Sequence, residues 1–341
     1  MSGSSWTFVF NVRPFCQHLA GLALALKKGG RGVEIVSVRG AVYFVFAAAV
    51  ALLVHPPDTG DLAFFVHTSQ KAAWDWFADP SVQVGPLQLV AFRLGDLAGV
   101  LALVVQLTAA ALFWIASGRL LAGRDPWIRF AVCMASVALG LTYGAYQDGH
   151  PAQMIVPLLW VLAGCDAREG RTVRAGVLVG LSAGLEVWGV LGAVVFVLAP
   201  RARAAVRGLA TEVGVASALF LPFVAAGEFR MLDFHWAVNG DTLLSLVIAP
   251  GTHFTWPMRL AQGLAALGAG AAVAWTLRRT THAVWFGPLT VVAVRMALDP
   301  VRYPWYWLAV QTLVLLGAAD LLAGHLRFAR KRHRRGLATL R

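Results

Sequence analysis

Charged residues and cysteines are both scarce in this sequence. Asp, Glu, Lys and Arg together make up 13% of its 341 residues, well below the share of about 25% in a typical soluble domain. Hydrophobic residues make up 58%, and the mean hydropathy is +0.67. This composition excludes a soluble domain of this length and predicts an integral membrane protein. The three cysteines lie far apart, which excludes a disulfide framework and a cysteine metal motif.

The net charge of +12 is carried by short basic clusters at the ends of apolar runs. The densest cluster is RFARKRHRR, at residues 327–335. Such clusters are typical of segments that stay in the cytoplasm beside anionic lipid headgroups. We therefore expect the lipid bilayer, and not nucleic acid, to be the partner of the basic residues.

Apolar runs of helical length recur along the chain. A helix needs roughly 17 to 25 apolar residues to cross a bilayer, and helices satisfy their own backbone hydrogen bonds there. The sequence predicts an all-α polytopic membrane protein of about eight transmembrane helices. The expected spans are 38–54, 87–116, 130–146, 153–164, 209–226, 259–277, 283–298 and 305–323. Residues 1–36 are expected to form a cytoplasmic or interfacial segment, 37–325 the transmembrane domain and 326–341 a basic cytoplasmic tail.

The stretch Ala175–Ala199 decides the topology, because arginines flank both of its ends. Both ends therefore prefer the cytoplasm. Its centre contains glycines and the ionisable Glu186, which favours a broken re-entrant hairpin over one straight crossing. With this topology both termini are cytoplasmic, and the outer side holds only six of the 29 Lys and Arg residues: Lys71, Arg93, Arg230, Arg259, Arg295 and Arg302.

Four predicted outward segments contain nearly all the residues suited to catalysis: 55–86, 147–150, 227–257 and 299–304. In the first, Asp58 and Asp61 follow the first span, and LAFFVHTSQKAAWDWF then predicts an amphipathic helix at the membrane interface. Either aspartate is also suited to cap that helix. Just before the last segment, Arg295 lies inside the apolar span 283–298, where an arginine is costly unless it is paired or wet. Asp299, one helical turn later, is its nearest structural partner.

The order of these segments resembles that of GT-C glycosyltransferases, particularly the polyprenyl-phosphate-mannose-dependent enzymes of glycosyltransferase family 87. The matching motifs are Asp61-Leu62, Gly85-Pro86-Leu87, the turn YQDGH at 146–150, AGVLVGLSAGLEVWG at 175–189 and RMALDPVRYPWYW at 295–307. The resemblance implies a GT-C-like fold with a jaw helix in the first outer loop. Glu186 departs from the pattern, because the family usually has a lysine there.

The resemblance implies an inverting transferase that moves mannose or arabinofuranose from a polyprenyl-phosphate donor to a glycolipid or glycan of the cell envelope, at the outer face of the plasma membrane. Asp61 corresponds to the family's catalytic carboxylate, although Asp58 stays an alternative base. Cationic Arg295 and Arg302 would hold the leaving phosphate, so that the chemistry needs neither a metal nor another cofactor. The expected substrate-binding residues are Asp58, Gln147, Asp148, His150, Arg295, Asp299, Arg302 and Tyr303.

Two other functions are compatible with the sequence. A transporter or lipid flippase would also contain a broken hairpin and buried charges. Against it, the chain has no inverted repeat, and its ionisable residues gather toward one face instead of the bilayer midplane. A scaffold subunit without catalysis leaves the buried Arg295 and the acidic first loop unexplained.

Overall fold

The computed structural model describes residues 38–54 and 60–338, with side chains as far as residue 326. These residues form helices and loops, and no β-strand lies among them. The α-helices are α2 (Val38–Leu53), α3 (Gly60–Gln70), α4 (Pro86–Leu97), α5 (Leu101–Leu120), α6 (Pro126–Ala138), α7 (Leu141–Gln147), α8 (Ala152–Arg168), α9 (Thr172–Leu185), α10 (Ala202–Ala226), α11 (Trp256–Leu277), α12 (Ala283–Ala297) and α13 (Trp307–Ala338). The 3-10 helices are η1 (Ala73–Asp75), η2 (Val187–Leu198), η3 (Met231–Asp233), η4 (Leu243–Leu246) and η5 (Pro304–Tyr306).

Five helical segments of the described chain are long and apolar enough to cross a bilayer: Leu101–Leu120, Pro126–Gln147, Ala202–Ala226, Trp256–Leu277 and Pro304–Leu326. Four shorter apolar helices, α2, α9, η2 and α12, accompany them. The chain is therefore a multi-pass membrane protein, as its composition predicts. The expected number of eight crossings stays a prediction.

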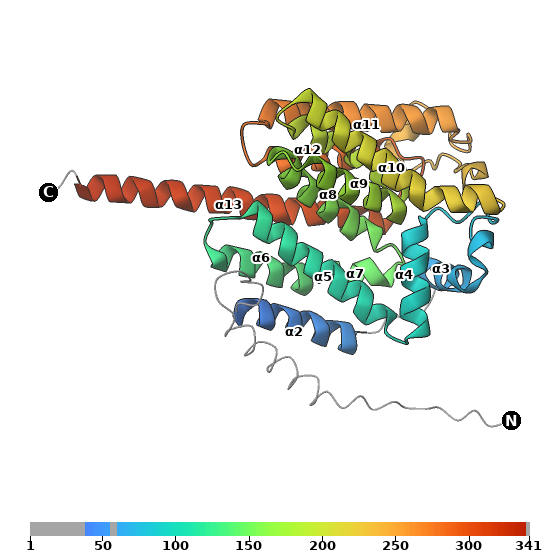
Figure 1. The fold of residues 1–341 in the computed structure, drawn as a ribbon, viewed down its shortest axis with the longest axis horizontal. Helices are drawn as coiled ribbons and strands as arrows, with labels where there is room; N and C mark the ends of the chain where they lie inside the picture. Colours follow the sequence, from blue (N-terminus) through green and yellow to red (C-terminus); the bar gives the residue numbers. More distant parts are fainter. Residues whose placement is uncertain (1–37, 55–59, 339–341) are drawn as a thin grey trace, which may run out of the picture.

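Two of the expected spans are interrupted by glycines in the left-handed conformation. The span expected at 87–116 is divided between α4 and α5, because the chain turns at Gly99, where φ is +64°. In Figure 1, α4 stands across the end of α5 instead of continuing it. The span expected at 130–146 is divided between α6 and α7 by Gly140, where φ is +74°. Glycine tolerates this conformation and ends a helix there even when the apolar run continues.

The amphipathic helix of the first loop is shorter than the sequence predicts. Helix α3 ends at Gln70, and residues 73–75 form η1. Leu62 and Phe65 are buried on one side of α3, and Trp76 and Phe77 are buried after η1. The aromatic residues of this segment thus enter a core beside α4, together with Leu89 and Phe92.

The stretch Ala175–Ala199 forms a helical hairpin, as its flanking arginines predict. Helix α9 runs up to Leu185, Glu186 is extended (φ −147°, ψ 141°), and η2 runs back along α9. A Cβ built on Gly189 would lie 2.2 Å from the carbonyl oxygen of Ser182, so only glycine allows the two arms to meet this closely. The hairpin therefore presents Glu186 at its tip.

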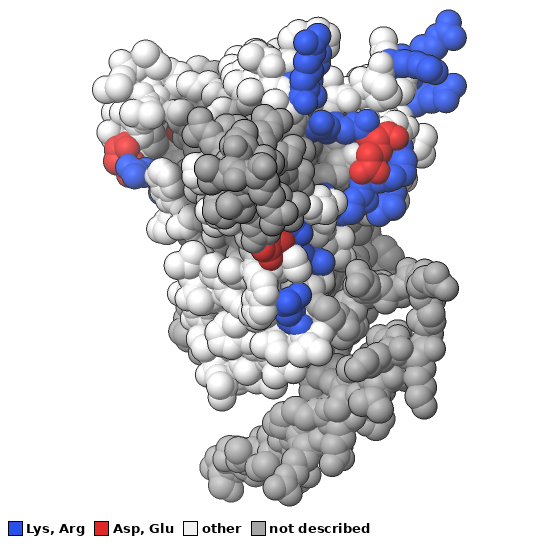
Figure 2. All heavy atoms as spheres, turned by 90° about the vertical axis from the view of Figure 1, so that its left-hand side faces the viewer, with Lys and Arg blue, Asp and Glu red and all other residues white. Residues whose placement is uncertain are grey.

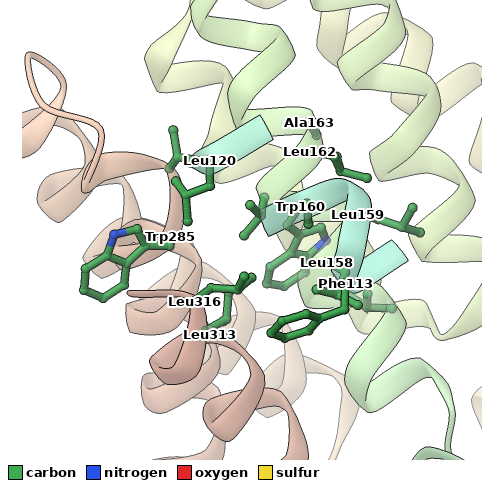
Figure 3. Packing of buried hydrophobic residues seen from close by; sticks show 14 of the residues in the cluster. Phe113, Leu120, Leu158, Leu159, Trp160, Leu162, Ala163, Trp285, Leu313 and Leu316 are labelled. Atoms are coloured by element: carbon green, nitrogen blue, oxygen red, sulfur yellow. The ribbon is translucent and has the colours of Figure 1, made fainter. Parts of the chain in front are cut away.

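Helix α8 is the centre of the packing, because it is buried along almost its whole length. Figure 3 shows Leu158, Trp160 and their neighbours on α8 among Phe113 of α5 and Leu313 and Leu316 of α13. The indole nitrogen of Trp160 donates hydrogen bonds to Ser182 Oγ at 3.0 Å and to the Gly189 carbonyl at 3.1 Å, which fix the hairpin against α8. Because α8 runs through the core, the residues packed around its first turn and those packed around its last turn lie at opposite ends of the bundle.

Charged residues gather at the end where α8 finishes. Asp166 there binds Arg119 at 2.9 Å, Arg171 at 2.7 Å and Arg174 at 3.0 Å. Figure 2, which views the molecule from the left-hand side of Figure 1, shows most of the visible charged residues on this side as basic. Helix α3 lies toward the opposite end in Figure 1, and its residues line the candidate site.

Candidate active site

A cavity of about 720 Å³ lies at the end of the bundle where α8 begins. Its walls come from α3, the segment before α4, the turn before α8, the tip of the α9–η2 hairpin, the loop after α10, the first half of α11, the end of α12 and η5. The polar and charged residues in these walls are Asp61, Ser81, Gln83, His150, Gln153, Glu186, Arg259, Gln262, Arg295, Asp299, Tyr303 and Tyr306. Segments that are far apart in the sequence thus converge on one cavity, in which these polar residues are set among apolar and aromatic ones.

Asp61 and His150 form the centre of one wall. Asp61 lies in the first turn of α3, where the helix dipole favours a carboxylate. Its Oδ2 is 3.0 Å from Nε2 of His150, and its side chain is 46% exposed, against 12% for His150. The carboxylate therefore faces the cavity, whereas the imidazole lies behind it.

Glu186 approaches the same imidazole from the hairpin tip. Its Oε1 is 3.3 Å from Nδ1 of His150, and its Oε2 accepts a hydrogen bond from Gln153 Nε2 at 2.9 Å. The indole of Trp188 donates a further hydrogen bond to the same oxygen. Glu186 is only 6% exposed, so these partners replace the water that a buried carboxylate loses.

Aromatic rings on two sides of the His150 imidazole fix the orientation of its ring plane. The Trp305 ring is stacked on His150 with a centroid distance of 4.7 Å and an interplanar angle of 9°. Tyr303 is stacked on Trp305 in turn, at 4.4 Å and 7°. Phe65 of α3 meets His150 edge-on at 5.4 Å. The orientation of His150 is therefore set by rings as well as by carboxylates.

The two carboxylates determine the charge of His150. Burial disfavours the imidazolium, but the hydrogen bonds and negative charges of Asp61 and Glu186 outweigh burial and raise the pKa of His150 to about 9. At neutral pH the ring therefore carries both protons and donates to both carboxylates. Burial also raises the pKa of Asp148, which lies in the same turn.

The other side of the cavity is basic. Arg295, near the end of α12, lies 3.7 Å from Asp299 and over the rings of Trp188 and Tyr306, at 4.8 and 5.1 Å from their centroids. Arg259, in the first turn of α11, has buried Nε and Nη2 atoms without a hydrogen-bond partner among the described residues. Unpaired buried N–H groups are costly, and an anion that reached them from the cavity would supply the missing acceptor.

Tyr303 connects the acidic and the basic sides. Burial raises the pKa of its phenol, and the charges of Asp61 and Asp299 raise it further. The ring therefore lies within electrostatic reach of both carboxylates. Burial likewise raises the pKa of Asp299, although Arg295 and Arg259 oppose this effect. A substrate in the cavity would thus meet a carboxylate and a pair of guanidinium groups at once.

The structure brings five of the predicted site residues into this cavity: Asp61, His150, Arg295, Asp299 and Tyr303. Asp148 lies beside the cavity without lining it. Gln147 and Arg302 are exposed and do not line it, because Gln147 ends α7 on its outer side and Arg302 lies in the open turn before η5. Asp58 lies outside the described residues.

Sequence reasoning assigned no site role to several polar residues of the cavity: Gln153, Glu186, Arg259 and Gln262. Glu186 carried the clearest signal, since it is an acid in the middle of a long apolar stretch. Arg259 carried a similar one as the first residue of an expected span. Gln153 and Gln262 are ordinary helix residues by sequence, and only the packing reveals their positions.

Comparisons of this chain with protein-family models, with curated proteins and with solved structures give no match. The resemblance to glycosyltransferase family 87 therefore stays a prediction.

Proposed function

We propose that this protein is a membrane glycosyltransferase that moves a sugar from a lipid-phosphate carrier to a hydroxyl group of an acceptor. One observation carries the proposal: a half-exposed aspartate and two arginines line the same cavity at one end of a membrane-embedded bundle. A lipid-phosphate sugar has its reactive bond at the level of the headgroups, so its enzyme needs a base and a phosphate site at an end of the bundle.

In the proposed reaction, Asp61 is the general base. It takes the proton of the acceptor hydroxyl as that oxygen attacks the anomeric carbon. The new carbon–oxygen bond forms while the bond from the anomeric carbon to the phosphate oxygen breaks, and the electron pair leaves with the lipid phosphate. Attack opposite the leaving group inverts the anomeric carbon. The proton stays on Asp61 until it is exchanged with solvent.

Arg259 and Arg295 are the proposed phosphate site. Their guanidinium groups keep their charge and can bind two oxygens of one phosphate. Arg295 is oriented by Asp299 and two aromatic rings, whereas Arg259 has unpaired donors in the cavity wall. Arg302, expected from sequence to share this role, is exposed outside the cavity, so we assign the role to Arg259 instead.

The orientation follows from the distribution of charge. The arginines that surround Asp166 lie at the end remote from the cavity. By the positive-inside rule that end lies in the cytoplasm, and the cavity then opens at the outer face. An outer site in a plasma membrane is reached by lipid-linked donors but not by cytoplasmic sugar nucleotides, which supports a lipid-phosphate donor.

The resemblance to family 87 supports the finer proposals. These are a GT-C-like fold with about eight crossings, mannose or arabinofuranose as the sugar, and a glycolipid or glycan of the cell envelope as the acceptor. The YQDGH turn and the Asp61-Leu62 pair, which carry the resemblance, contribute neighbouring parts of one wall. The helical hairpin at residues 175–199 supports it further.

The test is transfer by purified protein in lipid vesicles. Radiolabelled polyprenyl-phosphate mannose and polyprenyl-phosphate arabinofuranose are supplied with membrane glycolipid extract, and the labelled product is separated by chromatography. The native protein should form product, whereas Asp61→Asn should bind the donor without transferring the sugar. Asp75→Asn is the matched control, because Asp75 is an exposed carboxylate of the same loop that does not line the cavity.

A transporter or flippase would behave differently in the same vesicles. It would move intact donor between leaflets without cleaving it, and Asp61→Asn would not separate binding from product formation. Donor movement without labelled product, or equal transfer by native protein and Asp61→Asn, would contradict the proposed function.

A further inference from the structure

Glu186 is a buried carboxylate that the proposed reaction does not itself require. It takes no proton from the acceptor, and the imidazole of His150 separates it from Asp61. A buried acid in an apolar hairpin is costly, so the presence of Glu186 needs a physical explanation. The contacts around it supply one.

The hairpin tip is fixed to the segment that precedes α4. Gly85 N donates to the Leu185 carbonyl at 2.7 Å, and Val84 and Glu186 form an isolated antiparallel bridge. A Cβ built on Gly85 would lie 2.2 Å from the Gly184 carbonyl oxygen. The backbone around Glu186 is therefore held against residues 84–85, and its carboxylate has a defined position.

From that position the carboxylate begins a chain of hydrogen bonds that ends at Asp61. Gln153 and Trp188 donate to Glu186 Oε2, Glu186 Oε1 accepts from His150 Nδ1, and His150 Nε2 donates to Asp61 Oδ2. Each ring nitrogen of His150 thus faces the oxygen of a different carboxylate. His150 must carry both ring protons for both of its links to exist at once.

We propose that Glu186 is a positioning residue for the general base: through His150, it keeps a doubly protonated imidazole aimed at Asp61 Oδ2, so that the other oxygen of Asp61 is left to take the acceptor proton. The inference rests on the proposed function for its catalytic consequence. The geometry of the chain is independent of that function.

Loss of the Glu186 charge would act on His150 in two ways. The imidazolium would lose one of its two anionic partners, so the neutral ring, which carries a single proton, would be favoured over a wider pH range. A neutral ring that keeps its proton on Nδ1 cannot donate to Asp61, which would release the base from its position. Besides Glu186, the ionisable groups that interact with His150 are Asp61 from α3 and Asp148 from its own turn, whereas Tyr306 of η5 interacts with Glu186.

The test measures His150 directly. The protein is labelled with ring-¹³C histidine, reconstituted in lipid nanodiscs and titrated by NMR, and the His150 signal is assigned by its loss in His150→Gln. In the native protein it should titrate near pH 9, as the raised pKa requires. In Glu186→Gln the proton affinity of His150 should fall at least tenfold. Glu212→Gln, which removes a buried carboxylate of α10 outside the cavity, should leave the titration unchanged.

Kinetics supply the second readout. In Glu186→Gln the alkaline limb of the pH profile of kcat should move to lower pH by the same amount as the titration, while KM for the lipid-phosphate donor stays within about twofold, because the phosphate site is untouched. If Glu186→Gln does not fold, Glu186→Asp keeps the charge but withdraws it from His150 Nδ1, and it should shift both readouts in the same direction by less.

The outcomes separate the two proposals. An unchanged His150 titration in Glu186→Gln overturns the positioning role, and so does an unchanged alkaline limb. A shifted titration in a protein that transfers no sugar with any donor supports the hydrogen-bond chain but refutes the proposed function.

Discussion

Gly149 lies directly against the backbone of Leu62, so that a Cβ built on Gly149 would lie 2.7 Å from both the nitrogen and the Cα of Leu62. Gly149 precedes His150, and Leu62 follows Asp61. This contact between α3 and the turn that joins α7 to α8 is therefore next to the hydrogen bond that joins His150 to Asp61. Gln88 supports this arrangement, because its Nε2 donates to the Gly149 carbonyl at 2.8 Å.

Gly149→Ala should therefore separate the base from the imidazole. The added methyl group has no space beside the Leu62 backbone, and the positive φ of 72° costs alanine about 1 kcal/mol as well. We expect sugar transfer to fall at least tenfold, because misplacement of a catalytic group by about 1 Å is sufficient for such a loss. The measurement is kcat in lipid vesicles.

Gly99→Ala is the control for backbone strain. Gly99 also has a positive φ, of 64°, but a Cβ there meets nothing within 4 Å. It should lose a similar amount of stability and keep its activity. Equal activities of the two variants would mean that the contact of Gly149 with Leu62 does not position the base.

The choice between Arg259 and Arg302 gives a second prediction. Arg259→Ala should weaken binding of farnesyl phosphate at least tenfold, since a charge-assisted hydrogen bond contributes about 1.5–3 kcal/mol. Arg302→Ala should change it by less than about twofold, because Arg302 is exposed outside the cavity. Tryptophan fluorescence is a suitable signal, since Trp188, Trp236 and Trp305 line the cavity. The reverse order of effects would return the phosphate site to Arg302.

Stability should depend on pH through His150. The pKa of this group is raised from its ordinary value of 6.5 to about 9 in the folded protein, so the native state binds its proton more tightly than the unfolded state. The stabilisation is then complete below about pH 6.5 and is lost as the pH rises through about 9, a change of about 3 kcal/mol. The apparent Tm in detergent should fall across this window.

His150→Gln removes the titrating group, so its Tm should vary less between pH 6.5 and 9 than that of the native protein. His253→Gln, at an exposed histidine outside the cavity, is the control and should keep the native pH dependence. A native Tm that stays constant from pH 6.5 to 9 would show that the two carboxylates do not hold the proton on His150.

The helical structure of the apolar runs could be predicted from sequence, but the breaks within them could not. Apolar runs report burial in lipid or protein, and they continue through Gly99 and Gly140 because a turn inside an apolar environment needs no polar residue. The hairpin at residues 175–199 was predictable for a different reason. Its arginines on both sides require both ends to lie on one side of the membrane, whatever its length.

The candidate site was predictable only where a single residue conflicts with its surroundings. Arg295 and Asp61 are conspicuous because a charge in or beside an apolar run is costly unless it is paired, hydrated or used for function. The pairing of His150 with Asp61 joins residues 89 positions apart, and no local pattern reports on it. Arg259 and Arg302 look alike in sequence, and only the course of the chain before η5 decides that one enters the cavity and the other does not.

Asp320 provides the comparison for Glu186, since both are buried carboxylates near opposite ends of the bundle. Asp320 is fully buried and binds His282 Nδ1 at 2.7 Å, Arg124 at 3.5 Å and the indole of Trp285 at 3.2 Å. It lies far along α13 from the cavity, so its contacts join helices and face no substrate. Asp320→Asn should therefore destabilise the fold by about 3–5 kcal/mol, because it leaves Arg124 without its anion. At a permissive temperature, binding of farnesyl phosphate and the pH profile of kcat should both stay native. Glu186→Gln should show the opposite pattern, with a shifted pH profile and a smaller loss of Tm. If Asp320→Asn also moved the alkaline limb, that limb would report general loosening of the bundle and not the charge beside His150.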